Sequence, residues 1–159
     1  MSYKLLVLAP SAGGKSTLMR YLRKNSDLVV VEIDEEIMKA NNNTWPTDEE
    51  YNKLIPQITA EVISRENIIF FMKDIPIELV KQAKQSGFKV VLLKLTLEQL
   101  LGRNKNRMLE EGYEDASMWF KDQLEELDII GQEGLVDMII DGNLDTEEIA
   151  KEITSVCRR

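Results

Sequence analysis

The sequence contains no histidine, and its only cysteine is Cys157. These absences exclude Ser-His-Asp and Cys-His catalytic sites, the H-E-x-x-H zinc site and Cys/His metal clusters. An intramolecular disulfide is excluded too, because it needs two cysteines, and we therefore expect a reducing, cytoplasmic compartment. Any acid–base chemistry must come from Asp, Glu, Lys, Tyr or a metal-bound water.

Long apolar runs are also missing from the chain. The run Leu5–Ala9 is too short for a signal peptide and far shorter than the ~20 residues of a membrane span, so we expect no membrane association. The length of 159 residues falls within the ~100–200 residues usual for one domain. A hydrophobic fraction of 43% allows a full core, and we predict a single domain over residues 1–159.

Charge is in acidic excess but unevenly distributed. The chain has 20 Lys+Arg and 28 Asp+Glu, for a net charge of −8. By segment, residues 1–31 carry +4, residues 32–66 carry −6, residues 67–107 carry +5 and residues 108–159 carry −11. The acidic balance disfavours nonspecific binding to nucleic acid or membranes, although a nucleic-acid acceptor stays an alternative. The two basic blocks can still form a local cationic site.

Strand-like and helix-like segments alternate along the whole chain. We predict short, nearly continuously apolar strands at residues 3–8, 28–33, 67–72, 89–95 and 136–140. We predict helices at residues 15–24, 35–43, 48–64, 76–86, 97–111, 116–130 and 146–156, with Thr47 and Thr96 as N-caps. This alternation is typical of an α/β fold in which helices cover both faces of a five-stranded parallel sheet, giving three α/β/α layers.

The most specific motif follows the first predicted strand. Residues 9–17 read Ala-Pro-Ser-Ala-Gly-Gly-Lys-Ser-Thr, and they match the phosphate-loop pattern G-x-x-x-x-G-K-[ST] at seven of eight positions, with Ala9 in place of the first glycine. Gly13 and Gly14 let successive backbone N–H groups face a phosphate, and the following helix adds its positive end. In this context Lys15 would reach the β- and γ-phosphates, and Ser16 would hold Mg²⁺.

With Gly13-Gly14-Lys15-Ser16-Thr17 and five strand–helix units, the chain resembles the small P-loop kinases. This group includes the nucleoside monophosphate kinases, the shikimate and gluconate kinases, and the polynucleotide kinase and zeta-toxin type. The resemblance implies the P-loop nucleoside triphosphate hydrolase fold, ATP as donor and Mg²⁺ as cofactor, with Ala12 and residues 13–17 binding the nucleotide. It also implies an acceptor segment at about residues 35–66 and a lid at about residues 102–115.

The second predicted strand ends in Glu32-Ile33-Asp34. In shikimate-type kinases a D-x-D stands here, so the resemblance assigns Glu32 to Mg²⁺ and Asp34 to the acceptor hydroxyl, as catalytic base. A carboxylate at the carboxyl end of a strand beside a phosphate loop can accept a proton during phosphoryl transfer. The alternative is that Asp34 caps the next helix.

Arg103, Lys105 and Arg107 follow the fourth predicted strand, and Arg103 and Arg107 share a helix face. In the resembled kinases, lid arginines here stabilise charge on the transferred phosphoryl group. The alternative is a solvated basic face in which Arg107 pairs with Glu110 or Glu111. Gly102 and Gly112 flank these residues and are candidate hinges of this lid.

The acceptor segment points to a neutral substrate. Its carboxylates outnumber its three cations, and residues 35–64 contain no arginine to hold a phosphate or carboxylate. Lys73 and Asp74, after the third strand, could contact an acceptor or be loop charges. Trp45 could stack a ring, whereas Trp119, Phe120 and the methionines are expected in the core.

We therefore predict a kinase that transfers the γ-phosphate of ATP to a small hydroxyl-bearing acceptor such as a nucleoside or sugar. The alternatives are a nucleoside monophosphate kinase, a 5′-hydroxyl polynucleotide kinase and a non-catalytic ATP-binding module. Either a monomer or a homodimer is compatible with the sequence.

Overall fold

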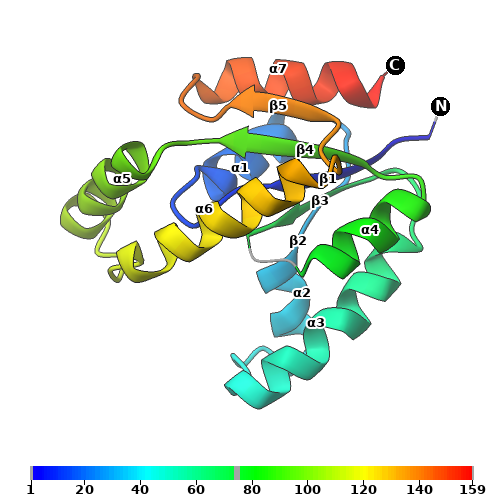
Figure 1. Cartoon of the computed structure of the whole chain (residues 1–159), viewed down its shortest axis with the longest axis horizontal. Helices are drawn as coiled ribbons and strands as arrows, with labels where there is room; N and C mark the ends of the chain where they lie inside the picture. The colour runs from blue at the N-terminus through cyan, green and yellow to red at the C-terminus, as the bar shows by residue number, and fades with distance from the viewer. Residues whose placement is uncertain (1, 74–75, 159) are drawn as a thin grey trace.

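The structure is a computed structural model that describes residues 2–73 and 76–158. Five parallel strands form one sheet in the order β2-β3-β1-β4-β5 (Figure 1). Their bounds are β1 Lys4–Leu8, β2 Val30–Glu32, β3 Ile68–Met72, β4 Lys89–Lys94 and β5 Met138–Asp141. The predicted α/β fold with a five-stranded parallel sheet is confirmed.

Seven helices occur in the described part of the chain, each between or after the strands. Their bounds are α1 Lys15–Asn25, α2 Ile33–Ala40, α3 Asp48–Ile63, α4 Ile77–Gln85, α5 Leu97–Glu110, α6 Ser117–Gln132 and α7 Thr146–Cys157. The predicted caps Thr47 and Thr96 are confirmed: each accepts a hydrogen bond from the third residue of its helix and forms a reciprocal capping box. No helix in the described ranges has the length and apolarity needed to cross a bilayer.

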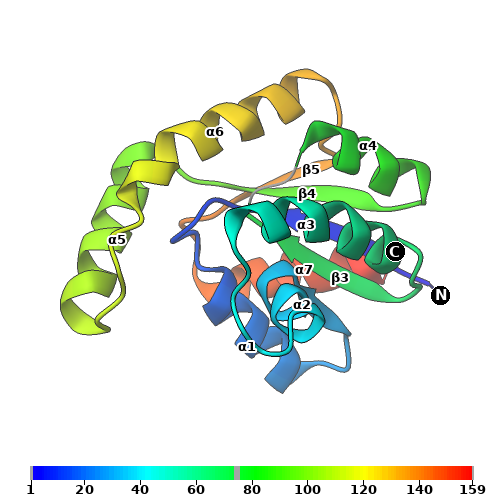
Figure 2. The same ribbon diagram turned by 90° about the horizontal axis from the view of Figure 1, so that it is seen from below.

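Strand residues alternate between two cores, one on each face of the sheet. Leu6, Phe70 and Val90 point to the face covered by α2, α3, α4 and α6. Leu5, Phe71 and Val91 point to the face covered by α1 and α7, so the sheet lies between two helical layers (Figure 2). Burial on both faces explains why the strands read as continuous apolar runs rather than alternating ones.

The strand order places the chain's functional segments along one edge. β1 and β3 are neighbours, and the connection after β1 leads to β2 on one side whereas the connection after β3 leads to β4 on the other. Connections that diverge in this way make a crevice beyond the carboxyl ends of the strands. The segments after β1, β2, β3 and β4 all begin at this edge because the strands are parallel.

Candidate functional site

The loop between β1 and α1 is held in a conformation that depends on its glycines. A Cβ at Gly13 would lie 2.7 Å from the Pro10 carbonyl oxygen, closer than any such contact tolerates. Gly14 has φ +84°, and Ala12 has φ 62°, a left-handed conformation that costs a non-glycine residue about 1–2 kcal/mol. At Ala9, which replaces the motif's first glycine, the backbone N–H donates to the Met72 carbonyl at 3.2 Å. The methyl group is fully buried, so this substitution is accommodated within the core.

A glutamine that the sequence did not reveal fastens the loop. The Ser11 backbone N–H donates to Gln123 Oε1 at 2.8 Å, and Gln123 Nε2 donates to Ser11 Oγ at 3.0 Å. Gln123 comes from α6 and is buried. These bonds connect residues 112 positions apart, so no local pattern could have identified the pair.

Lys15 is buried at the start of α1. Its ammonium donates to the Ala9 and Pro10 carbonyls at 3.2 and 2.8 Å, two acceptors of the loop itself. Burial, together with the nearby positive charge of Lys73, lowers the pKa of Lys15 to about 7, although Glu32 and Asp34 oppose the shift. The carbonyls thus hold the lysine where phosphate oxygens would be stronger partners.

Glu32, rather than Asp34, caps helix α2, and Asp34 lies in the first turn of that helix. Glu32 is the N-cap of α2, because its Oε2 accepts from the Glu35 N–H at 2.9 Å. Helix α2 therefore begins at Ile33, two residues earlier than predicted, and the assignment of Asp34 as the cap is wrong. Burial, reinforced by the charge of Asp34, raises the pKa of Glu32.

The carboxylate of Asp34 is paired at one oxygen only. Lys73 donates from Nζ to Asp34 Oδ2 at 3.0 Å, whereas Oδ1 is buried and has no hydrogen-bond partner in the described ranges. A buried, unsatisfied carboxylate oxygen is costly unless a ligand supplies its donor. Asp74, the other candidate after the third strand, lies outside the described residues.

Arg103 and Arg107 both turn toward the phosphate loop. Arg103 donates to the Gly142 carbonyl at 2.8 Å and packs on Gly14, and burial lowers its pKa against the opposing charge of Asp141. The guanidinium of Arg107 lies 4.2 Å from the centroid of the Tyr113 ring. Within the described ranges, Arg107 forms no ion pair with the two glutamates named in the alternative.

One cavity of about 790 Å³ lies at the carboxyl edge of the sheet, lined by the phosphate loop, Glu32, Asp34 and the two arginines. It brings together every predicted site residue: Ala12, Gly13, Gly14, Lys15, Ser16, Thr17, Glu32, Asp34, Arg103 and Arg107. Sequence reasoning did not assign six further polar residues that line it: Ser11, Arg20, Asn106, Glu110, Glu111 and Tyr113. Arg20 is four residues after Ser16 and three after Thr17 on α1, so the helical period was a usable signal.

Few protein ligands for a metal are present. Ser16 and Glu32 both line the cavity, whereas no cluster of three or more Asp, Glu or Cys residues suited to a metal occurs in the described part of the chain. This donor set fits Mg²⁺, which usually takes one or two protein oxygens and completes its shell with water and substrate phosphates.

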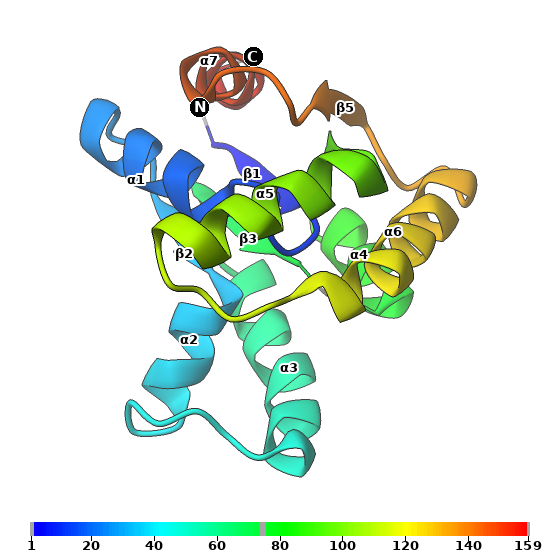
Figure 3. The ribbon, with the colours of Figure 1, turned by 90° about the vertical axis from the view of Figure 1, so that its left-hand side faces the viewer.

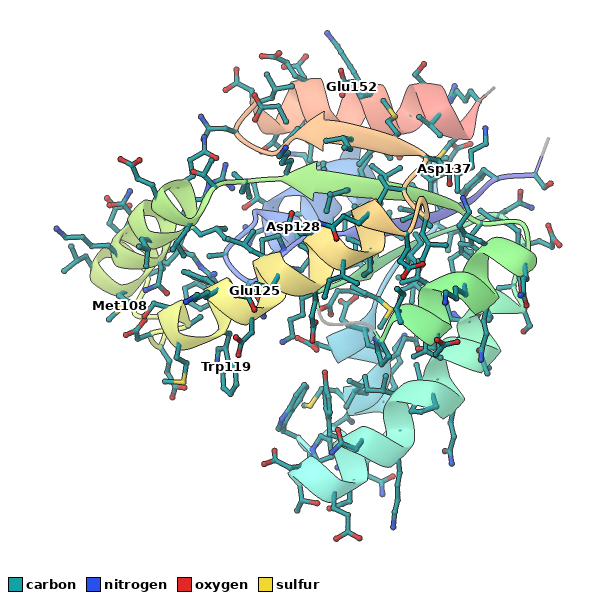
Figure 4. All side chains as sticks on the ribbon, viewed as in Figure 1. Met108, Trp119, Glu125, Asp128, Asp137 and Glu152 are labelled. Carbon is teal, nitrogen blue, oxygen red and sulfur yellow. The ribbon has the colours of Figure 1, made fainter. Side chains whose placement is uncertain are left out.

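Of the aromatic residues predicted to lie in the core, one is buried and one is exposed. Phe120 is fully buried, as expected, whereas the prediction that Trp119 belongs to the core is wrong, because its side chain is 56% exposed. Figure 4 shows Trp119 on the outer side of α6, directed away from the sheet. Met118 is also exposed. Trp45 is exposed beside Tyr51, with 5.8 Å between ring centroids, and Lys73 Nζ lies 6.0 Å from the centre of its ring.

Comparison with known proteins identifies the fold. The sequence matches no protein family model and no curated protein. Among solved structures, shikimate kinase from Bacteroides thetaiotaomicron superposes with a TM-score of 0.75 at 15% identity, covering 100% of both chains. Shikimate kinase from Acinetobacter baumannii, in complex with shikimate, gives 0.72 at 22% identity and covers 97% of this chain and 92% of its own. A gluconokinase from Sinorhizobium meliloti 1021 gives 0.64 at 18% identity, covering 99% and 92%. The chain therefore has the fold of the small P-loop kinases.

Proposed function

We propose that this protein is an ATP-dependent phosphotransferase that acts on a hydroxyl group of a small, uncharged acceptor. One observation carries the proposal: the phosphate loop with Lys15, the half-paired carboxylate of Asp34, and the arginines of α5 line the same cavity. These are the parts that phosphoryl transfer requires, namely phosphate positioning, a hydroxyl-proton acceptor and cations around the transferred group. The shared fold supports this proposal.

In the proposed reaction, the ammonium of Lys15 exchanges its two loop carbonyls for oxygens of the β- and γ-phosphates. Asp34 Oδ1 accepts the proton of the acceptor hydroxyl as that oxygen bonds to the γ-phosphorus. The bond from the γ-phosphorus to the β,γ-bridging oxygen breaks, and ADP leaves. Arg103 and Arg107 stabilise negative charge on the transferred group. When Mg²⁺ is bound with ATP, it neutralises charge between the β- and γ-phosphates, and Ser16 and Glu32 would hold it.

The acceptor side supports an uncharged substrate because two of its cations, Arg65 and Lys73, already contact carboxylates. Arg65 on the α3 side pairs with Glu61 and Glu36 at 2.6 and 3.3 Å, and Lys73 pairs with Asp34. An anionic acceptor would have to displace these carboxylates to gain a cation. An uncharged alcohol needs only hydrogen bonds, and Asp34 Oδ1 can accept one from its hydroxyl group.

A panel of acceptors with γ-labelled ATP tests the proposal. We expect label on neutral alcohols (sugars, nucleosides or amino alcohols) and none on AMP, CMP, shikimate or gluconate. Asp34→Asn should lower turnover by about 10²–10⁴ while ATP affinity, measured by calorimetry, stays unchanged. Asp48→Asn, which alters an exposed carboxylate of α3, is the matched control. Label on anionic acceptors alone would overturn the neutral-acceptor proposal, and ATP binding without any transfer would favour a non-catalytic module.

A further inference from the structure

Helix α5 has two different faces: one packs against the rest of the described chain, and the other is largely exposed. Leu100 and Asn104 are buried toward α6, whereas Arg103 and Arg107 face the cavity. On the opposite side, Leu101 is 44% exposed and Leu109 is 74% exposed. Figure 2 shows α5 projecting at one end of the molecule, and Figure 3 shows it nearest the viewer when that end is faced.

Exposed apolar side chains are concentrated in this region. Among the described residues, eleven large hydrophobic side chains are exposed, and six of them belong to α5 and the start of α6: Leu97, Leu101, Met108, Leu109, Met118 and Trp119. A concentration of exposed apolar side chains in one region is typical of an interaction surface.

Gly102 lies at the middle of the outer face of α5. A Cβ there would meet no atom within 4 Å, so packing within the chain does not require glycine. Its φ is not positive, and the helix runs through it, so backbone geometry does not require glycine either. A glycine inside a helix costs about 1 kcal/mol relative to alanine. Close approach of another helix is a physical reason to have no side chain at this point.

The outer face of α5 carries opposite charges that can pair with the same face of a second copy of the chain. Glu98 and Lys105 are seven residues, or two turns, apart on the outer side of α5. Within the described ranges neither one forms an ion pair. They are equidistant from the midpoint between Leu101 and Gly102. If two α5 helices pack antiparallel about that midpoint, Glu98 of each copy therefore lies opposite Lys105 of the other copy.

We propose that α5 is a self-association surface, on which two copies of this chain pack their α5 helices antiparallel about a two-fold axis. Leu101 of one copy packs over Gly102 of the other, and two Glu98–Lys105 ion pairs flank this contact. Because the opposite face of α5 carries Arg103 and Arg107, association also restrains the helix that supplies the site's cations. The inference does not depend on the proposed reaction, since it concerns the outer face alone.

Charge exchange tests the pairing directly. Sedimentation velocity from micromolar to millimolar concentration should show the wild type shifting from monomer to dimer. Glu98→Lys and Lys105→Glu should each remain monomeric, because each places like charges opposite one another. An equimolar mixture of the two variants should regain the dimer, since both ion pairs then form between unlike chains, and this recovery shows that both variants are folded.

Two further variants complete the test. Gly102→Leu should abolish association while the circular dichroism of the helices is kept. Glu152→Lys, on the far helix α7 (Figure 4), should dimerise like the wild type. A wild type that stays monomeric at every concentration would overturn the proposal. So would single charge variants that dimerise normally, or a mixture that stays monomeric.

Discussion

The cations on the phosphate side of the cavity have different partners from those on the acceptor side. On the acceptor side, Lys73 lines the cavity and contacts a carboxylate, and Lys53 and Arg65 of the acceptor segment, outside the cavity lining, each contact a carboxylate too. Lys39 of the same segment forms no ion pair within the described ranges. On the phosphate side, Lys15 and Arg103 contact backbone carbonyls instead, and Arg107 contacts a ring. Neutral partners leave the positive charge available to an anion, whereas carboxylates cancel it. This difference supports the proposal that one side binds a polyanion and the other an uncharged acceptor.

A substitution that distorts the phosphate loop should have the largest effect, because it removes the ATP-binding side of the comparison. Gly13→Val places side-chain atoms against the Pro10 carbonyl, so the loop cannot close around phosphate. We expect ATP binding, followed by calorimetry, to fall by more than about 100-fold, which corresponds to roughly 3 kcal/mol. Gly131→Ala is the control, because a Cβ at that position meets nothing within 4 Å. Near-normal ATP affinity in Gly13→Val would show that the loop does not form the phosphate site.

Two arginines, one from each side, test the difference in charge directly. Arg103→Ala should lower kcat/KM by about 10²–10³, since it removes a cation with no carboxylate partner. Arg65→Ala should leave kcat/KM within about threefold and cost at most about 1 kcal/mol of stability, because it breaks only partly exposed ion pairs. Steady-state kinetics and urea unfolding measure the two effects. Equal losses of activity in both variants would show that the two sides do not differ in the positive charge that they offer to the substrates.

The two sides also differ in how far the sequence predicted them. The phosphate loop is contiguous, and glycines and a lysine at fixed spacing after a strand specify its shape, so Ala12–Thr17 could be assigned before the structure. Glu32 and Asp34 were placed at the right edge, because all parallel strands end there. What the sequence could not show were long-range contacts: Gln123 on the loop, Lys73 on Asp34, and Arg103 on Gly142.

The exposed tryptophan shows another limit of prediction. An aromatic residue in an amphipathic segment is usually assigned to the core, because burial of a large apolar side chain is favourable. Helix α6, however, packs through Phe120 and Leu127, and Trp119 lies on its free side. Which face of a helix is covered depends on its neighbours in space, which periodicity alone does not reveal when apolar residues lie on both faces.

The buried ammonium of Lys15 should make the stability of the free protein depend on pH. Its pKa of about 7 in the folded state lies below the ordinary lysine value of 10.5, so between these values the unfolded state binds more protons. The free energy of unfolding should therefore rise with pH from about 7.5 to 9.5, by roughly 1 kcal/mol per unit from this group. Lys15→Met should remove that rise and be more stable than the wild type near pH 7. Urea unfolding across this range measures the difference between the two proteins, and parallel profiles would contradict the assignment.

The smallest expected effect comes from removing the hydrogen bonds between Gln123 and Ser11 of the phosphate loop. Gln123→Leu keeps the volume of the side chain but removes both hydrogen bonds to Ser11, leaving the Ser11 N–H without its partner. An unsatisfied group of this kind costs about 1–3 kcal/mol, to be measured by urea unfolding. Because the loop is also loosened, the KM for ATP should rise severalfold while kcat changes little. Gln82→Leu, on the exposed face of α4, should change neither quantity. A variant that loses stability but keeps the KM for ATP would show that Gln123 supports the packing of α6 rather than the phosphate site. The conformation of the loop would then be set by its own glycines and by the Pro10 and Met72 carbonyls alone.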